Sequence, residues 1–189
     1  MSVVAAREHE RILATARELV GEYGYRAATM ERIAEHAGVG KPTLYRWWPN
    51  RATLVHEALL DDVPEPAAAS AGSLAGDVRA FADGVASFFD RPLVREAWFG
   101  IVAELREDGD AWAGVERTWL RPAAEQLRQR LGEAMARGEC RPGIDHAVVL
   151  DLILGSCMAE LAVPPRGRTS RRRRVDSVVA VVLDGLRPS

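Results

Sequence analysis

Apolar residues recur every three or four positions along nearly the whole chain, and this helical period limits the fold more than any other feature of the sequence. A valine-rich run within 175–186 favours a strand by composition, but no other segment resembles a strand that could pair with it. We therefore expect a helix there as well, and the fold class is predicted to be all-α. Gly21 and Gly24 are expected to end the first helix, whose apolar stripe is Ile12, Leu13, Ala16, Leu19 and Val20.

The segment that follows predicts short helices separated by tight turns. Thr29 is a typical N-cap, because its hydroxyl can accept a hydrogen bond from an amide two or three residues on, and a helix over 30–37 should end at Gly38. The next helix is expected to begin near Lys41 and to end at Pro49, and Asn50 should cap the one after it. Two short helices joined by a glycine turn form a helix-turn-helix, whose second helix lies in the major groove of DNA.

Charge supports a nucleic-acid partner only locally. The formal net charge of the chain is −2, which by itself is not typical of a DNA-binding protein. Between His36 and His56, however, there is no Asp or Glu, and Lys41, Arg46 and Arg51 lie in that window. Residues 1–60 carry eight Lys/Arg and seven Asp/Glu, a net of +1, and the remaining 17 and 20 give −3.

The stretch "ATMERIAEHAGVGKPTLYRWWPNRATLVHEAL", residues 28–59, resembles the DNA-binding domain of TetR-family transcriptional regulators. It carries that family's pattern of Thr, Ile-Ala, Ala-Gly-Val, Thr-Leu-Tyr, an aromatic residue and a basic residue before a helix, and the resemblance covers most of residues 7–60. It implies phosphate contacts from Thr29 and Tyr45, and it puts Arg51 where the family usually has lysine. The predicted DNA-contacting residues are Thr29, Lys41, Pro42, Thr43, Tyr45, Arg46, Trp47 and Arg51.

Two positions depart from the family pattern, so the base preference of relatives does not transfer. Trp47 stands where a smaller aromatic residue or histidine is common, and Pro42 stands where Gly or Ala is frequent. Leu44 and Trp48 are expected to point into the core of their own domain. Trp47 is compatible with either core or DNA contact, and Arg46 with either DNA contact or a solvated charge.

The second half of the chain predicts longer helices after a connector. Residues 62–73, "DVPEPAAASAGS", are rich in Pro, Ala, Ser and Gly, which is typical of a linker. We therefore expect a DNA-binding domain over 1–61 and a second domain over 74–189. Its apolar stripes predict helices over 74–89, 92–105, 112–135, 146–163 and 175–186, with Gly138 as a C-cap and Asp145 as an N-cap.

In TetR-like proteins such C-terminal helices bind a small molecule and form a homodimer, and the resemblance implies both roles here. Aromatic residues concentrated in consecutive helices suit an apolar pocket, although such stripes also form ordinary cores. The predicted ligand-binding residues are Phe88, Trp98, Phe99, Trp112, Trp119 and Met158. The predicted dimer residues, which could instead pack within one chain, are Leu150, Ile153, Leu154, Gly155, Ala159, Val178 and Val182.

Motifs for catalysis or metal binding are sparse. The histidines form no zinc-ligand set, "GVGKPT" lacks the first Gly and the Ser/Thr of a phosphate-binding loop, and there is no G-x-S-x-G. We expect no enzyme, no cofactor and no metal. No run reaches the roughly 18 apolar residues of a membrane span, so a soluble, cytoplasmic protein without a membrane partner is expected. The Arg-rich segment 166–174 is compatible with a solvated linker or an anion-binding patch.

The predicted function is a DNA-binding repressor that a small apolar effector releases from a palindromic operator. Two other classes remain open from the sequence. One is a helical protein-binding module, and the other is an enzyme that uses the aromatic cavity; in both, the helix-turn-helix would be vestigial. The salt dependence of DNA binding separates the first function from the others, because contacts to phosphates make affinity fall steeply with salt.

Overall fold

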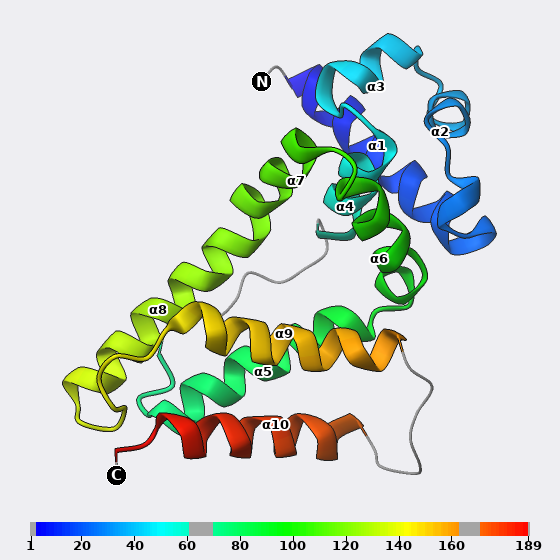
Figure 1. Ribbon diagram of the computed structural model, residues 1–189. Coiled ribbons are helices and arrows are strands. Elements are labelled where there is room, and N and C mark those ends of the chain that lie inside the picture. The colour runs from blue at the N-terminus through cyan, green and yellow to red at the C-terminus, as the bar shows by residue number, and fades with distance from the viewer. Residues whose placement is uncertain (1–2, 61–69, 163–170, 189) are drawn as a thin grey trace. The chain divides into compact units, whose positions relative to one another are not determined.

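The computed structural model describes residues 3–60, 70–162 and 171–188, and its regular structure in these ranges is helical, which confirms the all-α prediction (Figure 1). None of the described helices is both long enough and apolar enough to span a bilayer. The elements are α1 (Val3–Tyr23), the 3₁₀ turn η1 (Tyr25–Ala27), α2 (Met30–Ala37), α3 (Lys41–Trp47), α4 (Arg51–Leu60), α5 (Leu74–Asp90), α6 (Pro92–Leu105), α7 (Gly109–Val115), the π-helical η2 (Glu116–Leu120), α8 (Arg121–Ala136), α9 (His146–Ala162) and α10 (Arg171–Leu186).

By packing, the chain divides into two compact units. The first comprises residues 1–63 and 91–118, and the second comprises residues 64–90 and 119–189. Helices α6 and α7 therefore pack with the N-terminal helices rather than with the rest of the expected second domain. The functional boundaries at residues 61 and 74 stay predictions, and residues 62–69 of the expected connector lie outside the described residues.

In the first unit, α1 is the central helix and packs against α2, α4 and α6. Its predicted apolar stripe from Ile12 to Val20 is buried. The helix runs through Gly21 to Tyr23 and ends at Gly24, one of the two glycines expected to end it, which has a φ of +79°. The predicted caps are confirmed: the Thr29 hydroxyl accepts from the Arg32 amide at 3.2 Å, and the Asn50 side chain accepts from the Thr53 amide at 2.9 Å.

In the second unit, α5, α9 and α10 lie alongside one another, and α8 packs against α5 and α9 (Figure 1). Their shared core includes Val78, Leu131 and Leu183. A buried carboxylate fixes the start of α5, because Asp77 accepts hydrogen bonds from the Ser70 hydroxyl and, at 2.7 Å, from the Ala71 amide. The valine-rich run of 175–186 is helical, as predicted.

The single helix expected over 112–135 is interrupted. Residues Glu116–Leu120 form a π-helical turn between α7 and α8. Pro122 explains the interruption, since it has no amide hydrogen to donate to the carbonyl of Thr118 four residues earlier. At the other end of α8, the predicted C-cap glycine, Gly138, has a φ of +74°. The Glu139 amide then donates to the Ala134 carbonyl at 2.9 Å, which closes the helix.

Candidate nucleic-acid interface

Helices α2 and α3 are joined by a turn that depends on glycine. Gly38 has a φ of +63°, in the left-handed region that side chains disfavour. Its amide donates to the Glu35 carbonyl at 3.1 Å, and the Val39 amide donates to the Ala34 carbonyl at 3.0 Å. These bonds satisfy the last carbonyls of α2 and turn the chain toward Lys41. The predicted helix-turn-helix is therefore present in its expected place.

The inner side of α3 is fixed to the rest of the first unit. Leu44 is fully buried, and Trp48, the residue that ends the helix, is 2% exposed. The indole Nε1 of Trp48 donates to Oε2 of Glu57 on α4 at 2.7 Å. Both residues belong to the core, as predicted. Because one of them also makes a directional hydrogen bond, the helix is held in orientation as well as in position.

His9 of α1 lies against both tryptophans at the end of α3. Its ring centroid is 4.9 Å from that of Trp47 and 4.7 Å from that of Trp48. Its Nε2 lies 3.0 Å from Oε1 of Glu57. The two indoles also meet edge to face, with centroids 5.5 Å apart. Trp47 is therefore half-buried and packed against its own unit, and its predicted contact with DNA remains a prediction.

The outer side of α3 carries most of the predicted DNA-contacting residues. Lys41, Pro42, Tyr45 and Arg46 are exposed, Tyr45 to 50%, whereas Thr43 is half-buried. Thr29 is exposed at the start of α2. A phenol, an ammonium and a guanidinium on one short helix are groups that bind phosphate oxygens or base edges. These side chains are therefore exposed together on the outer side of α3.

Two cations of this face are paired with carboxylates from neighbouring helices. Nζ of Lys41 lies 2.8 Å from Oε1 of Glu31 on α2, and this hydrogen bond holds the pKa of the Glu31 carboxyl below its ordinary value. Nη2 of Arg46 lies 3.8 Å from Oε2 of Glu8 on α1, and its guanidinium also lies 5.0 Å from the centre of the Trp47 ring. Neither carboxylate lies in the acid-free window of the sequence.

Arg51, expected to contact phosphate, is engaged inside the first unit. Its guanidinium forms an ion pair with Glu104 of α6. Nη1 donates to the Arg26 carbonyl at 3.1 Å and the Tyr25 carbonyl at 3.4 Å. The same group lies 4.4 Å above the Tyr25 ring. Arg51 therefore does not lie with the exposed side chains of α3. Instead, Arg51 links α4 to α6 and η1.

A close approach of α6 to η1 completes this junction. A Cβ on Gly100 would lie 2.6 Å from Cε1 of Tyr25, so only glycine fits there. The roles of Gly100, Glu104, His9 and Glu57 were not predictable from the sequence, because each acts through a residue on another element. A glycine inside the apolar stripe of 92–105 was the one available signal, since such a residue often marks a close contact.

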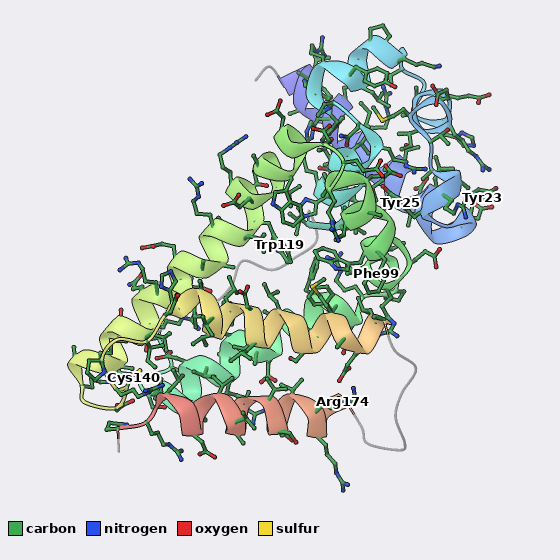
Figure 2. All side chains as sticks on the ribbon, viewed as in Figure 1. Tyr23, Tyr25, Phe99, Trp119, Cys140 and Arg174 are labelled. Atoms are coloured by element: carbon green, nitrogen blue, oxygen red, sulfur yellow. The ribbon has the colours of Figure 1, made fainter. Side chains whose placement is uncertain are left out.

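The predicted ligand-binding residues are divided between the two units. Phe88, Trp119 and Met158 belong to the second unit. The ring centroid of Phe88 is 5.3 Å from that of Trp119, which is labelled in Figure 2. Trp98, Phe99 and Trp112 belong to the first unit, where Trp98 is buried and the other two are exposed. The six side chains therefore do not form one cluster within either unit.

The described part of the second unit has an open groove of about 660 Å³ between α5 and α10, and none of the predicted ligand-binding residues lines it. Its lining is mixed, with Ala86 and Val175 beside Asp83, Asp90 and the ion pair between Arg79 and Asp176, at 2.5 Å. In the described ranges no three His, Cys, Asp or Glu side chains are grouped to hold a metal ion. Cys140 and Cys157 are free and buried, and burial raises the pKa of both thiols.

The predicted dimer residues fall on two sides of their helices, and their place in an interface stays a prediction. Leu150, Ile153 and Val182 are buried in the core of one chain. Periodicity alone does not fix the rotation of α9, because this helix is apolar on nearly every side. Leu154 and Val178 are half-buried, and Gly155 and Ala159 are exposed. The exposed apolar face consists of Val148, Leu152, Gly155 and Ala159 on α9 and Val181 on α10.

Most of the Arg-rich segment 166–174 lies outside the described residues. Of its described part, Arg174 lies in α10, and its Nε is 3.5 Å from Oε1 of Glu160. This pair engages one arginine within the second unit. Whether the remaining arginines bind an anion stays untested.

Comparison with protein families gives two matches that together span most of the chain. Residues 12–58 match the family described as bacterial regulatory proteins, tetR family. Residues 68–182 match the family described as tetracyclin repressor-like, C-terminal domain. The first match contains the whole helix-turn-helix, and the second contains α5 to α9 and most of α10.

Comparisons with individual proteins agree with the two family matches. The chain is 32% identical over 163 residues to the HTH-type transcriptional regulator YdeS of Bacillus subtilis (strain 168), covering 82% of this chain and 78% of YdeS. The TetR-family regulator SCO0332 shares the fold with a TM-score of 0.70 at 24% identity, over 96% of this chain and 99% of that one. NalD of Pseudomonas aeruginosa shares it with a TM-score of 0.63 at 21% identity, over 98% and 99%.

Proposed function

This chain belongs to the TetR family and is a DNA-binding transcriptional regulator, and we propose that it represses transcription from a palindromic operator until a small effector releases it. Its relatives are regulators rather than enzymes. NalD, which has the same fold, is itself described as a repressor of a multidrug efflux pump. A DNA-binding regulator acts where the DNA is, so we expect this one in the cytoplasm.

The observation that carries this proposal is the two-sided character of α3. Leu44 and Trp48 are buried and fix its inner side, whereas Lys41, Tyr45 and Arg46 are exposed on its outer side. A recognition helix needs both properties, because side chains can read a groove only from a rigid support. Tyr45 and Lys41 are proposed to hold phosphates and fix register, and the first turn of α3 is proposed to approach base edges.

Reading a palindrome requires two copies of α3, and the exposed face of α9 and α10 is proposed to join them. Val148, Leu152, Gly155 and Ala159 follow the helical period along one side of α9. Leu152 is 54% exposed and Val181 is 72% exposed, although both are large apolar side chains. Small residues between them let a partner helix approach closely. Two such pairs of helices form a four-helix bundle with two-fold symmetry.

The effector is proposed to be apolar and to bind in the second unit beside Phe88 and Trp119. Their contact places two aromatic rings at the end of α5, where Phe88 lies two residues before the last residue, Asp90. Helix α6 begins only two residues later, at Pro92. A ligand that moves the end of α5 therefore pulls on α6 through the chain itself. Glu104 of α6 in turn holds Arg51, the first residue of α4.

The test is binding to a site selected from random double-stranded DNA. Lys41→Ala should lower affinity and reduce the salt slope by up to about one if this side chain neutralises one phosphate. Tyr45→Phe removes only a hydroxyl and should weaken binding to all sequences alike. Arg128→Ala, which removes an exposed cation from α8, is the matched control and should bind like wild type. Wild-type affinity and slope in both α3 variants would contradict the proposal.

A further inference from the structure

The cations that the sequence placed in an acid-free window are not free of acids in the folded protein. Between His36 and His56 the chain has no Asp or Glu. Folding nevertheless brings one carboxylate to each cation of that window: Glu31 to Lys41, Glu8 to Arg46 and Glu104 to Arg51. In each case the carboxylate comes from a different helix. A phosphate that approaches α3 therefore meets cations that already have anionic partners.

The three pairs differ in how readily they can open. The Arg51 guanidinium is partly buried and has two backbone carbonyls as additional acceptors, so it is fixed in the fold. The Lys41 and Glu31 side chains are 52% and 59% exposed. Their 2.8 Å contact lies in water, where such a pair contributes little and breaks easily. The pair of Arg46 with Glu8, at 3.8 Å, is longer and weaker still.

We propose that Glu31 is an internal competitor for the DNA phosphate at Lys41, so that DNA binding exchanges a carboxylate for a phosphate at this cation. This inference rests on the proposed DNA-binding role of α3. Glu31 also lies in the first turn of α2, just after the Thr29 cap, which keeps its carboxylate close to the same surface. The lowered pKa of Glu31 means that this competitor is charged at neutral pH.

An exchange has a different salt dependence from a simple capture. Salt weakens the pair of Lys41 with Glu31 as well as the pair of Lys41 with phosphate, so part of the salt effect on DNA binding cancels. Without the carboxylate, the affinity of Lys41 for phosphate would show its full dependence on salt concentration. The competitor therefore lowers affinity mainly at low salt, and its effect should vanish at high salt, where the internal pair is screened.

The test compares Glu31→Gln with Glu35→Gln on a selected DNA site between low and high salt. Glu35 is the matched control, because it is an exposed acid one turn along α2 and has no ion-pair partner among the described residues. Glu31→Gln should raise affinity at low salt by roughly two- to fivefold, as expected for opening an exposed ion pair. It should also steepen the salt slope by up to ~0.9, and the affinities of Glu31→Gln and wild type should converge at high salt.

A double-mutant cycle assigns the effect to Lys41. In a Lys41→Ala background, Glu31→Gln should change affinity no more than Glu35→Gln does. Three results would overturn the inference: equal effects of Glu31→Gln and Glu35→Gln, an unchanged slope, or weaker binding by Glu31→Gln. Weaker binding would mean that Glu31 positions Lys41 instead of competing for it. If wild type selects no site at all, the proposed function fails first, and that outcome is distinguishable from these three.

Discussion

Different kinds of contact stabilise the interior of each packing unit. In the first, directional bonds join different helices: Trp48 to Glu57, Arg51 to Glu104, and Asn50 to Asp108 at 2.9 Å. In the second, apolar stripes form the core, Asp77 anchors the start of α5, and an ion pair between helices, Arg79 with Asp176, lies at the exposed surface. A surface that reads DNA must be oriented, and hydrogen bonds supply orientation, whereas a surface for a second copy needs exposed apolar area.

The largest effect is expected from removing the main anchor of α3. Trp48→Ala deletes a buried indole together with its bond to Glu57, and it should lower the free energy of unfolding by about 3 to 5 kcal/mol. Trp112→Ala is the control, since its exposed ring should cost roughly 1 kcal/mol. Denaturant unfolding measures both. Equal losses would show that the first unit does not depend on its anchored tryptophan.

A second effect is a pH dependence of the free energy of unfolding that arises in the first unit. His56 is buried in the first unit, and burial lowers its pKa from 6.5 to about 4. The unfolded chain takes up a proton below pH 6.5 while the folded chain does not, so stability is full above pH 6.5 and falls toward pH 4. The loss should reach about 3 kcal/mol.

His56→Gln isolates this titration from that of the carboxylates. The variant should lose less stability than wild type between pH 7 and pH 4, whatever its stability at neutral pH. The difference between the two unfolding curves is the quantity to measure. A difference that does not change with pH would mean that His56 titrates alike in the folded and unfolded states.

The smallest of these effects concerns the second unit and its proposed partner. Among the described residues, a Cβ on Gly155 would meet no atom within 4 Å beyond the neighbouring backbone of its own helix, and the same holds for Gly132 on α8. Gly155→Glu should therefore leave each protomer intact but weaken the dimer by about 1 to 3 kcal/mol through overpacking. Gly132→Glu should remain dimeric. Sedimentation at several protein concentrations measures this, and a wild-type monomer at micromolar concentration would refute the proposed dimer.

Local signals made the helix-turn-helix predictable. Thr29, Gly38 and Asn50 act within three or four residues of themselves, so their roles could be stated before the fold was known. The core positions of Leu44 and Trp48 followed from the need of a short helix to bury one side. The all-α class followed from the same period. These features require no knowledge of distant residues.

Contacts between distant residues were not predictable. Arg51 and Glu104 are separated by 53 positions, and nothing in the sequence pairs them. On α9, Gly155 and Ala159 were predicted and are exposed, whereas Leu150 and Ile153 were predicted with them and are buried. This helix is apolar all round, so periodicity could not tell the side buried by α5, α8 and α10 from the side left open. Pro122 was visible, but its effect on the preceding turn was not foreseen in the expected single helix.

The contact of Gly100 with Tyr25 has a consequence for inheritance in this family. The space at position 100 is filled by the ring at position 25, so neither residue can change freely on its own. A descendant that gains a side chain at 100 keeps this helix crossing only if 25 has first become smaller. The two positions should therefore vary together among related sequences, with glycine at one accompanying an aromatic residue at the other.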